Sequence, residues 1–431
     1  MTEPSATPAS TTRRDFLKTS AAVGAAAAAQ TFSVPHVHAA GSDVLRIGLV
    51  GCGGRGTGAG AQAGHADPNV KLVALADMFP DHLERAHKIL SKELKDKFDV
   101  PKERCFTGFD AYKQLIDCGV DVVVLASPPH FRPAHIKYAV EKGKHIFAEK
   151  PCAVDAPGVR AVLAAAEEAK KKNLAIVSGL CWRYDAGKRE TMKQIHEGAL
   201  GDIVAMQCSY NTGPLWSKER QQDWSDMEWQ LRNWLYFTWL SGDFNVEQHI
   251  HSLDKMAWAM KDEPPVKAVG LGGRQVRTDP RFGHIFDHHS VVYEWANGVK
   301  LFASCRQQAN CVNDVSDHVM GTKGTCDVMR HTIHTGGKPI WKFAGPPGVN
   351  MYQNEHNELF ASIRKGKPIN DGEWMSKSTL LAIMGRMATY TGQQITWQQA
   401  LSSKEDLTPA KYEFGPLSVP AVARPGITKF A

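Results

Sequence analysis

An apolar run that breaks into a glycine-rich turn constrains this chain more than any other feature. The run Leu45–Val50 is followed by Gly51-x-Gly53-x-x-Gly56 and then by alanine-rich sequence. This order predicts a buried strand, a tight turn and a helix. The first glycine of such a turn permits the bend, the second lets the backbone approach a pyrophosphate, and the third allows the helix to pack closely on the strand. The positive helix N-terminus then faces the phosphates. We therefore expect a dinucleotide site at Gly51, Gly53, Gly54, Arg55 and Gly56.

An acidic residue at the end of the next apolar run indicates which dinucleotide is preferred. Asp77 closes the run Val70–Asp77, where a carboxylate accepts hydrogen bonds from the adenosine ribose hydroxyls. The same carboxylate repels a 2′-phosphate, and residues 78–80 offer no cation to bind one. These residues favour NAD over NADP. Arg55 is the one loop residue long enough to reach a 2′-phosphate; its alternatives are the pyrophosphate or solvent.

Residues 1–40 have the pattern of an export leader. Thr12–Lys18 matches the twin-arginine motif, and the mildly apolar run Ala21–Ala29 follows it. That run is too short and too rich in alanine to predict a transmembrane helix. Cleavage after Ala39 or Ala40 is expected, with an uncleaved membrane tether as the alternative. The twin-arginine translocase is thus an expected partner, and the periplasm or another extracytoplasmic compartment the expected location.

The export route also bears on the cofactor. The twin-arginine system carries folded proteins, so a nucleotide can be loaded in the cytoplasm before export. Free NAD is scarce outside the cytoplasm, and a co-substrate that dissociated in every cycle would be lost there. We therefore expect a tightly held cofactor whose redox state is restored within the site.

Composition excludes several classes of partner. Residues 41–431 are enough for two domains of ordinary size, and 43% apolar and 22% charged residues are normal for a globular chain. The net charge of +6 is mild, and no cluster of Lys and Arg with interleaved aromatic residues indicates a nucleic acid. The 9 cysteines contain no C-x-x-C pair, which favours free buried thiols in a protein that folds in the cytoplasm.

Residues 41–180 alternate apolar runs with helical patterns, which predicts an α/β Rossmann domain with a doubly wound parallel sheet. The further strands are expected at Val120–Ala126, His145–Ala148 and Ala175–Val177, and the helices at Pro80–Leu94, Ala111–Cys118, His135–Lys142 and Ala156–Lys172. Ser127, Pro128 and His130 follow the carboxyl end of a predicted strand, where such sheets bind ligands. We expect these three residues to contact the cofactor.

Residues 181–431 have a different character. Strand-like runs occur at Ile203–Tyr210, Val266–Gly270, Ser290–Trp295 and Lys300–Ser304, and helical patterns at Asn354–Lys365 and Ser376–Tyr390. Asn297-Gly298 between two of these runs is a strong hairpin signal. The pattern predicts an α+β domain with an open-faced, largely antiparallel sheet that binds substrate and mediates oligomerisation.

The segment Ala148-Glu149-Lys150-Pro151 follows the strand expected at His145–Ala148. Together with the glycine turn and Asp77, it resembles the glucose–fructose oxidoreductase / myo-inositol dehydrogenase (Gfo/Idh/MocA) family. The resemblance implies a Rossmann domain joined to a C-terminal sheet domain, with Lys150 beside the nicotinamide and the substrate and Glu149 at the cofactor. It also implies a homodimer or a homotetramer. The alternative for Lys150 is an ordinary lysine at a strand end.

A second segment extends the resemblance. Glu247-Gln-His-Ile-His251-Ser-Leu-Asp254 is similar to the family's acid–histidine–aspartate motif, which implies proton transfer by His251, with Glu247 at a position usually held by Asp. The Glu and the additional His249 depart from the family pattern. Residues three and four apart share a helix face, and a carboxylate beside the imidazole would favour its protonated form. The alternative is a surface ion pair and a structural histidine.

Other polar and aromatic groups have more than one interpretation. Arg183 and Tyr184, in a segment that resembles the family's Arg-aromatic segment, are expected to contact the substrate, as is Asp254; Arg183 could instead lie at the interdomain seam. Asp287 and His288 are candidates for binding substrate hydroxyls. A metal site formed by His284, Asp287, His288 and His289, alone or together with His249 and His251, is the weaker alternative, because no ligand-spacing motif is present, and no metal is predicted. The clustered tryptophans Trp216, Trp224, Trp229, Trp234 and Trp239 suit a carbohydrate platform, an oligomer contact or the core.

These features lead to three hypotheses. The first is an exported NAD-dependent oxidoreductase that acts on a hydroxyl of a sugar, cyclitol or glycoside, with His251 as the base and Lys150 polarising the C–O bond. The second is redox-neutral glycoside hydrolysis or lyase chemistry through a transient keto-sugar. The third is a non-catalytic exported sugar-binding protein, against which the joint presence of Lys150, Glu247 and His251 argues.

Overall fold

The computed structural model describes residues 43–346 and 348–431, so the predicted export leader lies outside the described residues. The first sheet has six parallel strands in the order β3-β2-β1-β4-β5-β6. This is the strand order of a Rossmann fold, and it reverses between β1 and β4. The predicted fold class is confirmed. The strands are β1 (Leu45–Val50), β2 (Val70–Asp77), β3 (Cys105–Thr107), β4 (Val122–Leu125), β5 (His145–Ala148) and β6 (Ile176–Ser178).

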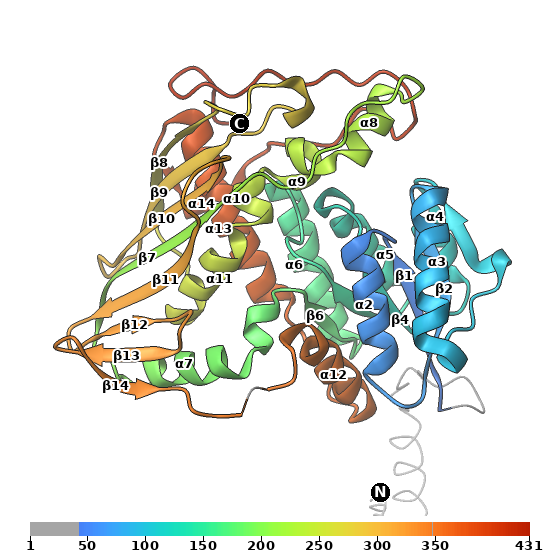
Figure 1. Ribbon diagram of the computed structural model, residues 1–431, viewed down its shortest axis with the longest axis horizontal. Coiled ribbons are helices and arrows are strands. Elements are labelled where there is room, and N and C mark those ends of the chain that lie inside the picture. The colour runs from blue at the N-terminus through green and yellow to red at the C-terminus, as the bar shows by residue number, and fades with distance from the viewer. Residues whose placement is uncertain (1–42, 347) are drawn as a thin grey trace, which may run out of the picture. The chain divides into compact units, whose positions relative to one another are not determined.

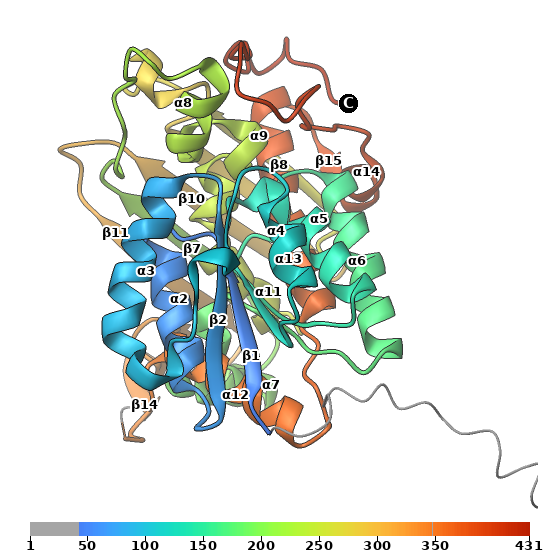
Figure 2. The same ribbon diagram turned by 90° about the vertical axis from the view of Figure 1, so that its right-hand side faces the viewer.

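Helices cover both faces of this sheet, as Figure 2 shows for α2 and α3 on one side and α4, α5 and α6 on the other. Two buried faces explain why β1, β2 and β4 are continuous apolar runs and lack alternation. Proline in the first turn begins α3, and the Asp155 side chain accepts from Gly158 N to cap α6. The helices are α2 (Gly54–His65), α3 (Pro80–Leu94), α4 (Ala111–Asp117), α5 (Arg132–Glu141) and α6 (Ala156–Lys171).

The second sheet has nine strands in the order β14-β13-β12-β11-β7-β10-β9-β8-β15 (Figure 1). Its pairs are antiparallel apart from β7 with β10, and the predicted hairpin at Asn297-Gly298 joins β9 to β10. The strands are β7 (Ile203–Thr212), β8 (Lys267–Gly273), β9 (His288–Glu294), β10 (Lys300–Gln307), β11 (Asp314–Gly321), β12 (Thr325–Asp327), β13 (Thr332–Thr335), β14 (Lys338–Lys342) and β15 (Ile395–Thr396).

Helices α11 and α13 pack on one face of this sheet, and in Figure 1 they lie between it and the first sheet. Helix α12 returns to the first sheet and shares an apolar core with α2 and α3. Segments from both ends of the chain therefore build the layer formed by the first sheet and its helices, which we call the first layer. The remaining helices are α7 (Ala186–His196), α8 (Asp226–Arg232), α9 (Thr238–Ser241), α10 (Phe244–Glu247), α11 (Ile250–Ala259), α12 (Met351–Arg364), α13 (Gly372–Thr391) and α14 (Trp397–Ser402).

Two further sequence expectations concern thiols and membrane spans. The nine cysteines all lie in the described part of the chain; they are free, and six of them are buried. Across residues 43–346 and 348–431, every helix is too short or too polar to cross a bilayer.

Candidate functional site

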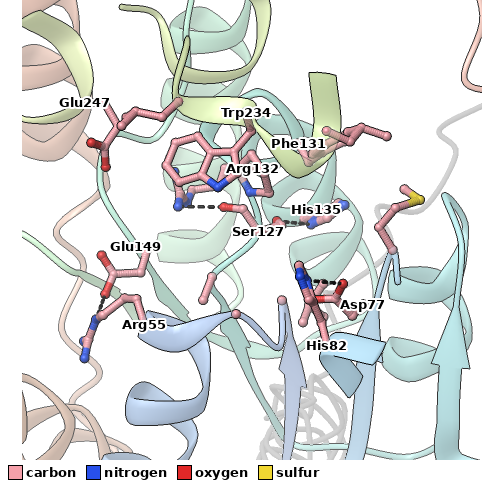
Figure 3. A pocket seen from close by; sticks show the side chains of 18 of the residues that line it. Arg55, Asp77, His82, Ser127, Phe131, Arg132, His135, Glu149, Trp234 and Glu247 are labelled. Atoms are coloured by element: carbon pink, nitrogen blue, oxygen red, sulfur yellow. Dashed lines mark hydrogen bonds and ion pairs between the residues drawn. The ribbon is translucent and has the colours of Figure 1, made fainter. Parts of the chain in front are cut away.

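A cavity of about 450 Å³ lies at the carboxyl ends of the first sheet's strands and is closed from the other side by residues of the second domain. Figure 3 shows Asp77 and His82 at one end, and Arg55, Glu149 and Glu247 toward the other. Ligands of doubly wound sheets bind at this edge. Of the predicted site residues, those that line the cavity are Gly51, Gly53, Arg55, Asp77, Ser127, Pro128, Glu149, Lys150, Glu247 and His251.

The glycines of the turn satisfy different requirements. Gly51 has φ +96°, and a Cβ there would lie 2.5 Å from the carbonyl carbon of Ala126. A Cβ on Gly56 would lie 1.8 Å from the carbonyl oxygen of Gly51, so the start of α2 depends on its absence. Gly53 lines the cavity, yet its Cβ would meet no described atom within 4 Å. The space left open at Gly53 fits a pyrophosphate at the N-terminus of α2.

This difference gives a prediction about the turn. Gly53→Val should lower nucleotide affinity by about tenfold or more, because the side chain fills the space above the helix N-terminus, while the melting temperature stays close to that of wild type. Gly56→Ala should instead destabilise the fold, by about 1–3 kcal/mol, because of its clash with Gly51. Equilibrium binding of NAD(H) and thermal melting measure the two effects.

Gly54→Val is the matched control, because Gly54 is exposed and does not line the cavity. Unchanged nucleotide binding by Gly53→Val would contradict this account of the turn.

Backbone hydrogen bonds hold the Asp77 carboxylate at the edge of the cavity. Its Oδ2 accepts from Cys52 N (2.6 Å) and its Oδ1 from Phe79 N (2.9 Å), while His82 Nδ1 lies 3.3 Å from Oδ1. Each carboxylate oxygen has acceptor capacity beyond one bond. The fixed orientation therefore suits a diol, as expected for a ribose.

Arg55 is engaged by acidic side chains of the protein. It pairs with Glu149 and with Glu355 (Nη2–Oε1 2.8 Å), and its Nη1 donates to Gln62 (2.7 Å). Burial and the charge of Glu149 raise the pKa of Glu355 well above its usual value, while Arg55 opposes the shift. The hypothesis that Arg55 extends to a 2′-phosphate disagrees with this arrangement, because its guanidinium is bound to these three partners. Figure 3 shows Arg55 beside Glu149 and apart from Asp77.

Lys150 and Glu247 form a pair between the two domains. The Lys150 ammonium donates to the Glu247 carbonyl oxygen (2.6 Å) and to its Oε1 (2.8 Å), and both side chains are about nine-tenths buried. Glu247 Oε2 also accepts from Gln248 (2.6 Å). An ammonium has three donors. Among the described residues Lys150 uses two of them, which leaves one for a ligand in the cavity.

The environment of His251 differs from the prediction. Glu247 binds Lys150 and Gln248, so no carboxylate pairs with the imidazole, and Nδ1 of His251 is buried without a hydrogen-bond partner in the described chain. Burial, together with the charges of Lys150, Lys255 and Arg55, lowers the pKa of His251 well below its usual 6.5. The carboxylate that the sequence placed beside the imidazole binds Lys150 instead, so it does not favour the protonated form of His251. A neutral ring in the cavity is a proton acceptor.

A break in the helix separates Glu247 from His251. Helix α10 ends at Glu247 and α11 begins at Ile250, so the two residues do not share one continuous helix face. The Asp243 side chain caps α10 by accepting from Phe244 N. His249 between them is buried and bonds Asn245 (3.0 Å), and burial lowers its pKa to about 3. His249 is therefore a buried histidine that is hydrogen-bonded within the protein interior.

Several residues predicted to contact ligands lie outside the cavity. Arg183 forms an ion pair with Asp254 (2.8 Å) and with Asp262 (2.6 Å), and its guanidinium lies 4.1 Å from the ring centre of Trp374. Tyr184 donates to Asp371 (2.5 Å). This environment matches the alternative of an interdomain seam.

Asp287 and His288 of the histidine-rich segment also lie outside the cavity. Asp287 accepts from the backbone N–H groups of residues 275–277 and pairs with His288 (2.8 Å), so it orders its own loop. These hydrogen bonds lower the pKa of Asp287, although its burial opposes them. His130 is also outside the cavity. Within residues 43–346 and 348–431, no group of three or more His, Cys, Asp or Glu side chains is placed to hold a metal ion.

The tryptophans divide between the core and the cavity. Trp229 and Trp239 are buried in an apolar cluster. Trp216 and Trp234 line the cavity, with ring centres 6.0 Å apart in an edge-to-face arrangement. Trp216 is 46% exposed. Tryptophans that cluster in the sequence therefore occupy two different environments.

Three residues of the site had no signal in the sequence. Arg132 is buried beside the cavity and donates to the carbonyl oxygens of Ser127 (2.7 Å) and Pro151 (2.6 Å), which supports the loops that follow β4 and β5. Tyr210 of β7 and Tyr352 of α12 also line the cavity. They come from elements far along the chain, so only the tertiary fold brings them here.

Comparisons with known proteins agree with this architecture. Residues 45–177 match the model of the oxidoreductase family with an NAD-binding Rossmann fold, GFO_IDH_MocA, and residues 189–327 match the GFO/IDH/MocA C-terminal domain. Residues 10–29 match the twin-arginine translocation signal. That match indicates export.

Individual relatives are distant. Glycosyl hydrolase family 109 protein 1 of Bacteroides fragilis is 28% identical over 218 residues, which cover 50% of this chain and only 45% of that protein's length. Inositol 2-dehydrogenase of Rhizobium meliloti is 27% identical over 344 residues, covering 76% of this chain and 92% of that protein. The crystal structure of an aldose-aldose oxidoreductase from Caulobacter crescentus has the same fold, with a TM-score of 0.65, 21% identity and coverage of 82% and 99%.

Proposed function

Because this chain belongs to the Gfo/Idh/MocA family of NAD-dependent oxidoreductases, we propose that it oxidises a hydroxyl group of a sugar, cyclitol or glycoside with a retained nicotinamide cofactor. One observation carries the proposal. A single cavity is lined by Gly53 and Asp77 and also by Lys150 and His251. The residues proposed to bind the nucleotide and those proposed to transfer the proton thus line the same cavity.

Each polar group has a role in this proposal. A bound nicotinamide supplies the hydride chemistry. His251, neutral because of its burial, accepts the hydroxyl proton. The remaining donor of Lys150 hydrogen-bonds to the substrate oxygen and stabilises its developing negative charge. Glu247 holds the ammonium in place through two contacts.

The proposed cofactor is NAD, bound before export and kept in the periplasm. Asp77 supports this preference, because a carboxylate held by two backbone N–H groups cannot turn away from a 2′-phosphate. The match to a twin-arginine signal supports export in folded form. Oxidation of one hydroxyl would then be followed by reduction of a second acceptor or of the same substrate.

The outer face of the second sheet supports a homodimer or a homotetramer. Val269, Leu271 and Phe302 share this face through the pairing of β8, β9 and β10. They are 44%, 67% and 49% exposed in the single chain. An apolar sheet face of this kind favours burial against a second copy.

The pair Trp216 and Trp234 supports a carbohydrate substrate. Aromatic faces suit the apolar faces of sugar rings. Trp216→Ala should raise KM about threefold to tenfold with little change in kcat, because a stacking contact contributes about 0.5–1.5 kcal/mol. Trp224→Ala is the control, since Trp224 does not line the cavity and stacks on Arg232. Equal KM values for the two variants would contradict a role for Trp216 in substrate binding.

A second candidate is redox-neutral cleavage of a glycoside. The similarity to glycosyl hydrolase family 109 proteins favours it. Oxidation of a ring hydroxyl to a ketone acidifies the neighbouring C–H, which permits elimination of the glycosidic substituent. For hydrolysis, water then adds across the resulting double bond and a solvent proton returns to the carbon beside the ketone; return of the hydride to the ketone leaves no net redox change. Without the addition of water, the same elimination gives a lyase product.

One experiment tests both candidates. The purified protein is incubated with sugars, cyclitols and glycosides in D₂O, and the products are analysed by mass spectrometry. A ketone without bond cleavage supports the first candidate. Cleavage with one solvent deuterium at the carbon beside the oxidised centre supports the second. If no compound of these classes is oxidised or cleaved by nucleotide-loaded protein, both fail.

A further inference from the structure

The chain beyond α14 crosses from the first layer to α8. Near its start Leu407 N donates to Asp155 Oδ2 (3.0 Å). Near its end Met227 N donates to the carbonyl oxygen of Gly415 (3.1 Å), and Gln230 Nε2 to that of Leu417 (2.8 Å). Figure 1 shows this C-terminal segment, in red, beside α8. Residues 405–417 are therefore tied at one end to the N-terminus of α6 and at the other to α8, and we call them the clasp.

Between these ties, two aromatic residues of the clasp pack on residues that line the cavity. The Phe414 ring stacks on Phe79 with centres 6.2 Å apart and an interplanar angle of 16°, and it lies 5.8 Å from Phe109. The Tyr412 ring lies 5.7 Å from Phe109, and its hydroxyl hydrogen-bonds to His130 Nε2 (2.7 Å). Phe79 and Phe109 both line the cavity. The clasp thus packs against Phe79 and Phe109, which form this part of the cavity wall.

Phe79 and Phe109 belong to the adenosine end of the cavity. Phe79 follows Asp77 by two residues, and its N–H donates to that carboxylate. Phe109 follows β3, which pairs with β2. Asp77 is the expected ribose acceptor, so the two rings lie where the adenine would be bound. The Arg232 guanidinium of α8, 3.9 Å from the Phe79 ring centre, holds the same loop from the second domain.

We propose that the clasp slows release of the nucleotide by holding Phe79 and Phe109 closed over its adenosine end. This inference rests on the proposed function, because it concerns how the cofactor of that site is retained. Release requires the two rings to separate, and Tyr412 and Phe414 must leave their partners first. Tyr412 and Phe414 are 44% and 50% exposed, so their contacts can open without disruption of the core.

The test compares exchange of bound nucleotide in the full-length chain. Wild type and Tyr412→Ala/Phe414→Ala are loaded with radiolabelled NAD and chased with an excess of unlabelled NAD. The double variant should release label at least tenfold faster, with an unchanged melting temperature of the nucleotide-free protein. Val419→Ala, an exposed apolar side chain just beyond the clasp, is the matched control and should exchange like wild type.

The outcomes separate this inference from the proposed function. If wild type neither retains nor binds NAD, the proposed function fails. If wild type retains label and the double variant releases it at the same rate, the clasp is overturned and the proposed function stands. If the double variant melts at a lower temperature, the single variant Phe414→Ala is tested in its place. It should release label faster than wild type, and an unchanged rate of release would overturn the proposal.

Discussion

Replacing Lys150 with methionine should lower kcat by about 10²–10³-fold while nucleotide remains bound. The reason is electrostatic, because the ammonium is the only cation of the described chain that combines direct contact with Glu247 and a donor left for the cavity. Removal of one preorganised donor to a developing negative charge commonly costs this much. Steady-state turnover of the best substrate from the panel, together with bound nucleotide per chain, measures the effect.

Two controls accompany this variant. Lys171→Met changes the same residue type at a position that is 75% exposed, on the surface of α6, and should leave kcat unchanged. Glu247→Gln tests whether the carboxylate acts by positioning, and should reduce kcat less than Lys150→Met because the Glu247 carbonyl oxygen still accepts from the ammonium. Full turnover by a folded Lys150→Met protein would remove Lys150 from the mechanism.

Replacing His251 with asparagine should lower kcat by about 10²–10⁴-fold, the usual contribution of a general base. Its environment also predicts the pH dependence. Because burial and the neighbouring cations lower the pKa of His251 well below 6.5, the imidazole is already neutral at pH 6. Activity should therefore stay level between pH 8 and pH 6, and fall only at more acidic pH as the base becomes protonated.

The matched control is His288→Asn, the same substitution at a histidine outside the cavity. It should retain wild-type kcat, and a large loss there would restore the earlier expectation that His288 binds substrate. For His251, a wild-type profile that loses half its activity near pH 6.5 would contradict the buried environment described above. A His251→Asn protein with wild-type kcat would contradict its role as base.

Most of the first layer could be predicted, because the sequence patterns that specify its strands and turns are local. The glycine turn, the continuous apolar strands and the acid at Asp77 each act within a few residues, and the strand His145–Ala148 was predicted with its observed ends. Strand β3 of the first sheet and strands β11 to β15 of the second were not predicted. Strands β12 to β15 have two to five residues and lie toward the ends of the second sheet, and β14 exposes residues such as Lys338 and Ile340. Strand β11 lies between β12 and β7 and is rich in polar residues. Pairing with β7, rather than an internal pattern, determines β11.

The candidate site, too, could be predicted from the sequence only in part. The family resemblance brought Lys150, Glu247 and His251 to attention, and the structure brings all three to one cavity. It did not reveal that Glu247 binds Lys150 while His251 lacks a carboxylate partner, because a break between α10 and α11 changes their relative orientation. Likewise the Arg55 partner Glu355 lies on α12, which reaches the first layer only in the folded chain.

The most direct test of this account is the nucleotide content of the purified protein. The protein is purified, dialysed extensively and denatured, and the released small molecules are identified and quantified by mass spectrometry. The account predicts close to one NAD(H) per chain, with little NADP(H). Release of no nucleotide, combined with no binding of added NAD(H), would contradict the enzyme proposal at its first step and leave a sugar-binding protein on a Rossmann scaffold as the better explanation.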